Sequence, residues 1–351
     1  MSNRVNFVSS LLAVMKIMTS VDLFAIGNAL IDQEFQVSDA FLTEQNLQKG
    51  TMQLTDGETQ AQLFQNLKNS QTYKGQASGG SAANSTVAFS ALGGSAFYAC
   101  RVGNDELGSI YLKGLNDANI QTSTQSISEG VTGTCMVLVS PDSERTMHTY
   151  LGITAELTNT QIDFTPLKTA KWLYIEGYLS TSDTARQAVK QARLIARNHG
   201  VKIALTLSDP AMVQYARQGL DELLDDGVDL LVCNEQEALM YTQTEKLDQA
   251  LLNLKTLSSI VVITLGAQGA IIAQAEQTFL VPGRQVVAVD TNGAGDAFSG
   301  SFLYALNANH DLHSAAELAI LISSQVVSQF GPRLDVADYA NRLKEFQMDV
   351  A

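Results

Sequence analysis

The second half of the chain alternates between short apolar runs and longer segments of helical spacing, and no other feature restricts the fold as strongly. Strand-like runs at 172–175, 202–207 and 230–233 are separated by helix-like segments at 184–199 and 212–224. This alternation is typical of βαβ units, in which helices cover a sheet of parallel strands. We therefore predict an α/β fold with a mostly parallel sheet.

Two regions interrupt this alternation, at about 33–60 and 120–152, and both contain strand-like runs. In the second region, runs at 133–140 and 145–151 flank a Pro-Asp-Ser turn and predict a hairpin. We expect the two regions to join into one small β-sheet that forms a lid over the main domain and excludes water from it. Two separate peripheral hairpins are the alternative.

Residues 1–20 precede the first predicted strand and form an extension to a single domain predicted at 22–347. The apolar run of this extension is too short and too interrupted to span a bilayer. A start at Met15 or Met18 would leave residues 1–17 out of the native protein, and a weak signal peptide is the other interpretation.

The composition restricts the partners and the compartment of the protein. A net charge of −14 over 351 residues argues against nucleic acids and anionic membranes as partners, because both require clustered Lys and Arg. The three cysteines are far apart and form no CxxC pair. An odd number of separated cysteines predicts a reducing compartment, the cytoplasm.

A glycine-rich turn enters a helix-like segment at the sequence Asp-Thr-Asn-Gly-Ala-Gly-Asp, residues 290–296. The amides of Gly293, Ala294 and Gly295 are unobstructed at a predicted helix N-terminus, where unpaired N–H groups and the helix dipole attract anions. Asp296 follows within the first turn, where a carboxylate can act as a general base. An anion site beside a base suits phosphoryl transfer to an alcohol. A tight turn with an ordinary first-turn carboxylate is the alternative.

A second glycine turn precedes another helix-like segment at Gly79 and Gly80, with Asn84 in its first turn. Asp32 follows the first predicted strand. The amide and the carboxylate together could hold neighbouring hydroxyl groups of a sugar ring. A helix-capping loop with an incidental asparagine is the alternative.

Two further groups lie at predicted strand ends. Asn234 and Glu237 follow the strand-like run that ends at Cys233, at the sheet edge where ligands of parallel sheets bind. Their oxygens could hold Mg²⁺ through water, and a helix N-cap is the alternative. Thr264, Gly266 and Gly269 form a glycine turn that suits either a nucleotide loop or a plain hairpin. The sequence contains neither a P-loop nor a dinucleotide-binding motif.

These motifs together resemble a known family. DTNGAGDAFSG at 290–300 matches the C-terminal signature of the ribokinase-type (PfkB) kinases, and SGGSAAN at 78–84 with RVGNDELG at 101–108 matches the N-terminal one. Shorter matches in family order are GN-A-L-ID at 27–32, TGTC at 132–135, NEQEA at 234–238 and TLGAQGA at 264–270. The resemblance covers about 22–347 and is strongest to adenosine kinases.

The resemblance implies a three-layer α/β/α domain with a β-sheet lid, and phosphorylation of a hydroxymethyl group with ATP and Mg²⁺. It implies that Asp296 is the base and that the amides of Gly293 to Gly295 form the anion hole. It places Asp32, Gly79, Gly80 and Asn84 at the acceptor, Asn234 and Glu237 at the magnesium and phosphates, and Thr264, Gly266 and Gly269 at ATP. It places Asp290 and Asn292 at a monovalent-cation site, which would take K⁺.

One segment departs from the adenosine-kinase pattern. Those kinases carry aromatic residues after a strand to stack on the base, whereas this chain has Glu176-Gly177-Tyr178-Leu179. Tyr178 is the candidate for stacking, and the next position is aliphatic. Arg145, on the predicted lid hairpin, could meet an acceptor phosphate or lie in solvent.

We therefore expect a cytoplasmic, ATP-dependent nucleoside kinase, with adenosine as the first candidate for the acceptor. A sugar kinase acting on a furanose such as fructose or ribose is the second hypothesis, and a non-catalytic sensor of a nucleoside or sugar is the third. The expected partners are the small-molecule acceptor and ATP. The sequence leaves open whether the protein is a monomer or a homodimer.

Overall fold

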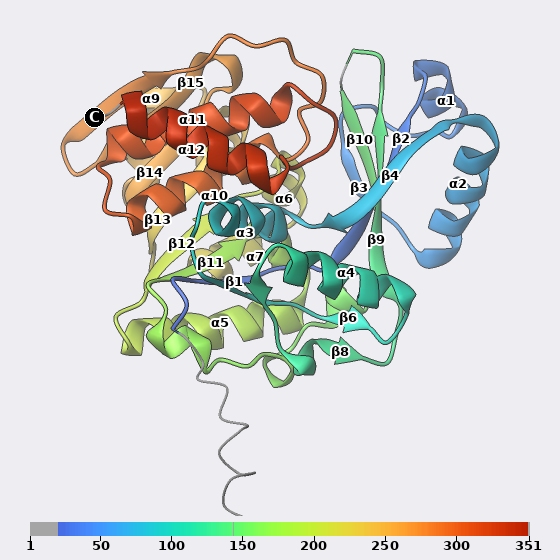
Figure 1. The fold of residues 1–351 in the computed structure, drawn as a ribbon, viewed down its shortest axis with the longest axis horizontal. Coiled ribbons are helices and arrows are strands. Elements are labelled where there is room, and N and C mark those ends of the chain that lie inside the picture. The colour runs from blue at the N-terminus through green and yellow to red at the C-terminus, as the bar shows by residue number, and fades with distance from the viewer. Residues whose placement is uncertain (1–19, 143, 350–351) are drawn as a thin grey trace, which may run out of the picture.

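A nine-stranded sheet is the largest element of the computed structural model, which describes residues 20–142 and 144–349 (Figure 1). The predicted extension, except for Ser20, lies outside the described residues. Neighbouring strands are parallel from β7 to β14, and the last two are antiparallel. The order across the sheet is β16 (Gln277–Pro282), β15 (Gly269–Gln274), β14 (Ser258–Thr264), β13 (Val228–Asn234), β12 (Lys202–Thr206), β11 (Trp172–Glu176), β1 (Leu23–Ile26), β5 (Ala96–Ala99) and β7 (Ile120–Gln121).

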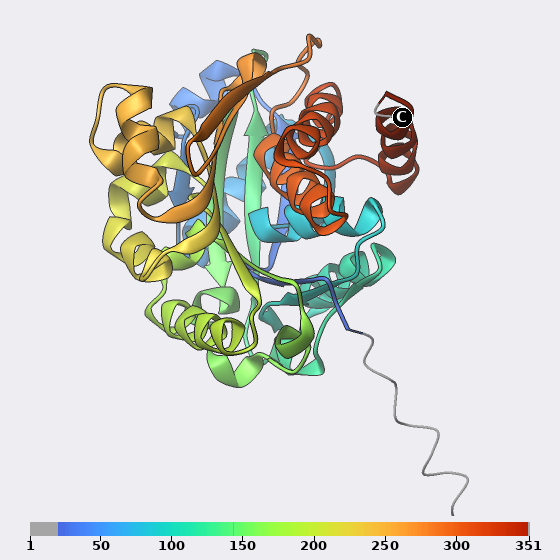
Figure 2. The same ribbon diagram turned by 90° about the vertical axis from the view of Figure 1, so that its left-hand side faces the viewer.

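Helices cover both faces of this sheet, as the edge-on view shows (Figure 2). In β1, Leu23 and Ala25 pack into one apolar cluster, and Phe24 and Ile26 into the other. The first cluster includes α3 (Ser81–Ala91), α4 (Glu106–Asp117), α10 (Ala294–Asn307), α11 (Leu312–Val327) and α12 (Val336–Asp349). The second includes α5 (Asp183–Asn198), α6 (Pro210–Tyr215), α7 (Arg217–Leu224), α8 (Glu235–Thr242) and α9 (Leu247–Leu254). The predicted α/β fold with a mostly parallel sheet is confirmed.

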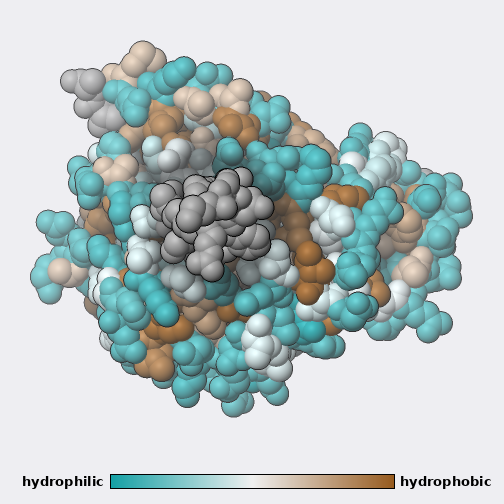
Figure 3. All heavy atoms as spheres, turned by 60° about the horizontal axis from the view of Figure 1, so that its bottom comes forward, coloured by the Kyte–Doolittle hydropathy of each residue, from teal (hydrophilic) through white to brown (hydrophobic). Residues whose placement is uncertain are grey.

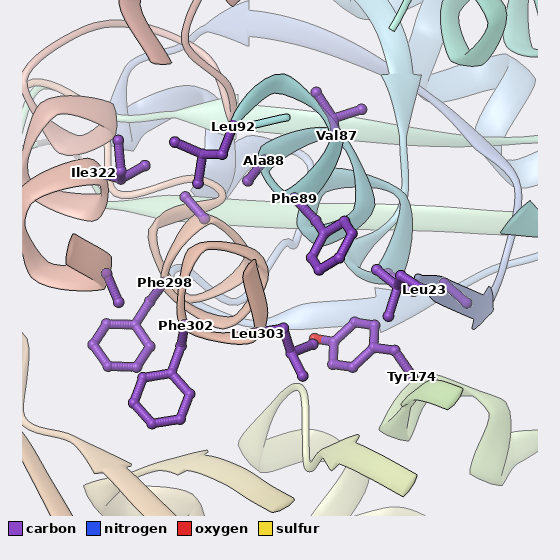
Figure 4. Close-up of a cluster of buried hydrophobic side chains, with 14 of the residues drawn as sticks. Leu23, Val87, Ala88, Phe89, Leu92, Tyr174, Phe298, Phe302, Leu303 and Ile322 are labelled. Atoms are coloured by element: carbon purple, nitrogen blue, oxygen red, sulfur yellow. The ribbon is translucent and has the colours of Figure 1, made fainter. Parts of the chain in front are cut away.

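Helices α3 and α10 pack closely against one another (Figure 4). The rings of Phe298 and Phe302 stack with centroids 5.9 Å apart, and Phe89 of α3 meets the ring of Tyr304 of α10 edge-on at 6.0 Å. A Cβ atom added to Gly300 would lie only 2.0 Å from the carbonyl oxygen of Ser85, so the helices approach as closely as a glycine allows. This packing brings the first turns of the two helices together.

A second, five-stranded sheet lies beside the main domain, with strand order β3 (Met52–Leu54), β10 (Arg145–Gly152), β9 (Thr132–Val139), β2 (Leu30–Gln36) and β4 (Thr72–Gly79). The predicted hairpin is confirmed as the antiparallel pair β9 and β10. Strand β4 lies outside the two predicted lid regions, whereas β7 from the second region joins the large sheet. A short ribbon pairs β6 (Val102–Gly103) with β8 (Ile127–Ser128).

The small sheet has two differently covered faces. Phe35, Met136 and Leu138 point to α1 (Asp39–Glu44) and α2 (Gly57–Ser70), with which they form an apolar cluster. The alternate residues Cys135 and Val137 point the opposite way, because successive side chains of a strand alternate. One face therefore packs under helices and the other faces the main domain.

In the view of Figure 3, hydrophilic residues cover most of the visible face and hydrophobic residues occur in small groups between them. None of the helices in the described part of the chain is long and apolar enough to cross a bilayer.

Candidate active site

A cavity of about 320 Å³ lies at the carboxyl ends of the parallel strands and is covered by the small sheet. Ligands of open α/β sheets bind at this edge. The cavity brings together most of the site residues predicted from the sequence. Those that line it are Asp32, Gly80, Asn84, Tyr178, Asn234, Glu237, Thr264, Gly266, Asn292, Gly293, Gly295 and Asp296. Gly79, Gly269, Asp290 and Ala294 do not line it.

The N-terminus of α10 contains two glycines, Gly293 and Gly295, whose surroundings differ. Gly293 has a φ of +70°, and a Cβ there would lie 2.2 Å from the carbonyl oxygen of Pro332, so the fold requires glycine. A Cβ on Gly295 would meet nothing within 4 Å. Within the described residues, the amides of Gly295 and Asp296 have no hydrogen-bond acceptor, whereas Ala294 donates to Thr291. The first turn therefore offers free N–H groups beside open space.

The carboxylate of Asp296 is held by two side chains from α3. Ser81 Oγ donates to Oδ1 at 2.6 Å and Asn84 Nδ2 donates to Oδ2 at 2.8 Å. Burial raises the pKa of Asp296, and these two hydrogen bonds and the charges of Arg145 and Arg333 oppose the increase. The group is thus fixed in place with its proton affinity raised, as a general base requires.

Asp32, on β2 of the small sheet, faces the same cavity without a partner. Its carboxylate accepts no hydrogen bond from the residues that the structure describes. Burial raises its pKa to about 7. A Cβ on Gly79 would lie 2.1 Å from the carboxyl carbon of Asp32, and one on Gly80, whose φ is +94°, would lie 2.6 Å from the carbonyl oxygen of Asn28. The double glycine therefore makes room for Asp32 and for the turn into α3.

Glu176 ends strand β11 and is completely buried. Its Oε1 accepts from the amide of Asn28 at 2.7 Å and its Oε2 from the amide of Ala82 at 2.8 Å. Burial raises its pKa to about 7. This carboxylate connects the end of β1 to the first turn of α3 and thereby supports the wall that carries Ser81.

Arg145 reaches from β10 of the small sheet to the glycine-rich turn. Its Nη1 donates to Asn292 Oδ1 at 2.8 Å and its Nε to Thr291 Oγ1 at 3.3 Å. The small sheet thus contacts the turn directly, and a positive charge lies beside the free amides of α10. The sequence left open whether Arg145 lies in the site or in solvent. In the structure it lines the cavity.

Asn234 and Glu237 form a capping box at the start of α8. Asn234 Oδ1 accepts from the Glu237 amide at 2.8 Å, and Glu237 accepts from the Asn234 amide at 3.0 Å and from Nδ2 at 2.7 Å. Burial raises the pKa of Glu237 to about 8. Both residues line the cavity, as does Asp209. Such hard oxygen donors fit Mg²⁺ held through water.

Two other predicted groups lie at the edge of the cavity. Thr264 ends β14, and Gly266 has a φ of +56° with nothing within 4 Å of an added Cβ. Gly269 is different, since its Cβ would lie 2.0 Å from the carbonyl oxygen of Val281. Gly269 therefore serves the hairpin of β15 and β16, and Gly266 borders open space.

Asp290 is fully buried behind the glycine-rich turn. Its Oδ1 accepts from the amide of Asn292 at 2.8 Å and its Oδ2 from the amide of Gly331 at 2.9 Å. Nearby, Glu34 Oε1 and Asn292 Nδ2 are buried without a partner in the described part of the structure. No group of three or more His, Cys, Asp or Glu among the described residues is arranged to hold a metal ion.

Comparison with known proteins identifies the family. Residues 51–338 match the family model described as pfkB family carbohydrate kinase. The chain belongs to this family. It is 32% identical to adenosine kinase from Sinorhizobium meliloti, with a TM-score of 0.88 and with 93% of this chain and 99% of that chain covered.

Curated relatives include both adenosine kinases and ribokinases. Ribokinase of Mus musculus is 32% identical over 239 residues, which are 65% of this chain and 71% of the relative. Adenosine kinase of Saccharomyces cerevisiae is 24% identical over 330 residues, 88% of this chain and 96% of the relative. The predicted resemblance is confirmed, and this pfkB kinase is a phosphotransferase that acts on a hydroxyl group.

Three residues of the site in this pfkB kinase were not predicted as such. Ser81 follows the double glycine directly, so its position in the motif was a usable signal. Glu176 is a charged residue at the end of an apolar strand, which is a weaker signal. Arg333 donates from Nε to Asn84 Oδ1 at 2.7 Å and has no sequence motif around it.

Proposed function

We propose that this pfkB kinase transfers the γ-phosphoryl group of ATP to the hydroxymethyl group of a nucleoside, with adenosine the favoured acceptor. One observation carries the proposal: Asp296 is fixed by Ser81 and Asn84 in the helix turn whose free amides border open space. A base and an anion cradle in one helix turn are the two elements that phosphoryl transfer to an alcohol requires.

The acceptor is oriented from the opposite wall. The unpartnered carboxylate of Asp32 would accept hydrogen bonds from neighbouring hydroxyl groups of the sugar ring. The hydroxymethyl oxygen then bonds to the γ-phosphorus, the bond from that phosphorus to the β,γ-bridging oxygen breaks, and the proton passes to Asp296. The amides of Gly295 and Asp296 and the charge of Arg145 offset the negative charge of the group in transfer.

The donor side is formed by the ends of β13 and β14. We propose that Asn234, Thr264 and Gly266 contact ATP and that Glu237 holds Mg²⁺ through water. When bound, Mg²⁺ neutralises phosphate charge and so favours the departure of ADP. We also propose K⁺ at Asp290 and Asn292, whose buried oxygens lie directly behind the glycine-rich turn.

The apolar part of the cavity favours a nucleoside over a free sugar. The small sheet contributes both aliphatic and sulfur-containing side chains to the wall, and Tyr178 lines the cavity from the main domain. These side chains are Leu30, Met52, Leu54, Cys135, Val137, Met147 and Leu151. A purine base has apolar faces that such a wall can bury, whereas a furanose presents mostly hydroxyl groups.

A furanose kinase remains the second candidate because the cavity has one aromatic wall residue after β11. Leu179 is 1% exposed and packs in the core under the sheet, so only Tyr178 of this segment lines the cavity. A site with one stacking ring is also compatible with a smaller acceptor.

The test is ATP consumption by the purified protein with Mg²⁺ and K⁺, against adenosine, inosine, guanosine, ribose and fructose in separate reactions. Turnover on adenosine, with the phosphate on the hydroxymethyl oxygen by ³¹P NMR, is the expected result. Turnover on ribose or fructose and on no nucleoside would overturn the proposal and select the furanose kinase. Repeating the active reaction with Na⁺ in place of K⁺ tests the cation.

A further inference from the structure

A partly buried arginine lies directly behind the proposed acceptor site. Arg333 follows α11 in sequence, and its Nε donates to Asn84 Oδ1 at 2.7 Å, while Asn84 Nδ2 donates to Asp296 Oδ2 at 2.8 Å. A third contact joins Arg333 Nη1 to Ser78 Oγ at 3.1 Å. A chain of two hydrogen bonds therefore runs from the guanidinium through the amide of Asn84 to the base.

The chemistry of the two end groups fixes the orientation of Asn84. A guanidinium only donates hydrogen bonds and an ionised carboxylate only accepts them. The amide between them must then turn its oxygen to Arg333 and its nitrogen to Asp296. Without Arg333, the side-chain amide of Asn84 could rotate and turn its oxygen toward the carboxylate of Asp296. The two oxygens would then repel one another.

The segment 331–333 contacts the site at three successive positions. The amide of Gly331 donates to Asp290, the carbonyl oxygen of Pro332 lies against Gly293, and Arg333 binds Asn84. The segment thus supports both the glycine-rich turn and the α3 residue that holds the base. Gly331, Pro332 and Arg333 do not themselves line the cavity.

We propose that Arg333 is a positioning residue of the acceptor site, which holds Asn84 in the orientation that fixes Asp296 and supplies the counter-charge behind it. This inference rests on the proposed function of Asp296 as the base. Arg333 Nη2 is buried and has no acceptor within the described residues, an arrangement that costs stability. One nitrogen of Arg333 thus stays unsatisfied, while the other two bind Asn84 and Ser78 beside the site.

The charges around the pair come from several elements. The positive charge of Arg333 lowers the pKa values of Asp32 and Asp296, against the larger effect of burial that raises both. The titratable and charged groups that interact electrostatically with Arg333 or Asp296 come from several elements; they are Asp32, Tyr111, Arg145, Tyr174, Glu176, Tyr178, Glu237 and Tyr339. Among them, Arg145 is the other cation, and it binds the turn and not Asn84.

The first experiment compares the pH dependence of kcat/KM in wild type, Arg333→Met and Arg333→Lys, with the best acceptor. We expect Arg333→Met to lower kcat about 10- to 100-fold and to move the acidic limb up by about one pH unit. The KM for ATP should not change. Arg333→Lys keeps the charge and should recover part of both effects. Arg193→Met is the matched control, because Arg193 is a buried arginine that binds carbonyl groups and Asp226 away from the cavity.

The second experiment does not depend on turnover. Thermal unfolding of wild type, Arg333→Met, Asp296→Asn and the double variant forms a double-mutant cycle. We expect the loss of Tm caused by Arg333→Met to be smaller in the Asp296→Asn background.

Strictly additive shifts of Tm together with an unchanged pH profile of kcat/KM would overturn the inference. If Arg333→Met does not fold, the Arg333→Lys variant provides the test. A lysine variant with the kcat and KM of wild type would overturn the inference that Arg333 positions Asn84. Coupling in this cycle without turnover on any acceptor would instead refute the proposed function.

Discussion

Helices α8 and α10 both begin at the cavity, but their first turns are satisfied in opposite ways. At α8, Asn234 and Glu237 satisfy one another in a capping box. At α10, Gly293 provides no side chain, and the amides of Gly295 and Asp296 have no acceptor in the described structure. A helix end that its own residues satisfy needs no ligand, whereas free amides beside open space leave a site for an anion.

The largest effect expected from this comparison is that of Asp296→Asn. The variant should lose about 10²- to 10⁴-fold in kcat, because asparagine cannot accept the proton of the acceptor. Its Tm should not fall, since a buried charge is removed. Steady-state kinetics and thermal unfolding measure both. Asp311→Asn at the exposed start of α11 is the control, and equal turnover in both variants would refute the role of Asp296.

Gly295→Ala should affect catalysis and stability in opposite directions. The added methyl meets nothing in the protein, so stability should rise by about 0.5–1 kcal/mol, while a phosphoryl group would lose its place and kcat should fall about 10²-fold. Gly300→Ala in the same helix is the matched control. Its Cβ would strike Ser85, so it should lower the Tm. A Gly295→Ala variant with full activity would contradict the anion site.

The pH dependence of the free energy of unfolding tests whether Asp32 is buried without a hydrogen-bond partner. Its folded pKa of about 7 lies above the ordinary value of 3.8, so the native state retains a proton that the unfolded chain loses. The stability that this proton contributes is present below pH 3.8 and is lost as the pH rises through 7. Asp32→Asn should therefore raise the free energy of unfolding near neutral pH by about 1–4 kcal/mol. Denaturant unfolding of both proteins across this range measures it, and parallel curves would contradict it.

The smallest expected effect is that of Asn234→Ala at α8. Loss of the capping box should lower the free energy of unfolding by about 1 kcal/mol. If Asn234 also contacts ATP, as proposed, the KM for ATP should rise and the Mg²⁺ dependence should change. A variant that loses stability with unchanged KM and Mg²⁺ dependence would show that this helix end is only structural, and would sharpen the contrast with α10.

Local patterns predicted most of the elements that form the site. The strand and helix alternation predicted the large sheet, and the two glycine turns predicted the starts of α3 and α10. The hairpin β9–β10 was also predicted from its turn. Strand β4 was not included in the predicted lid regions, because its segment at 72–79 contains no apolar alternation and is held by pairing with β2.

The sequence by itself determined the α/β class, the family and the likeness of Asp296 to a general base, because these depend on local periodicity and on motifs of adjacent residues. The tertiary structure alone decided what holds the carboxylate of Asp296. Ser81 and Asn84 lie 215 and 212 residues from Asp296, and Arg333 lies 249 residues from Asn84. Such pairs arise from the close packing of α3 on α10 and from the return of the chain after α11, and neither leaves a periodic signal in the sequence.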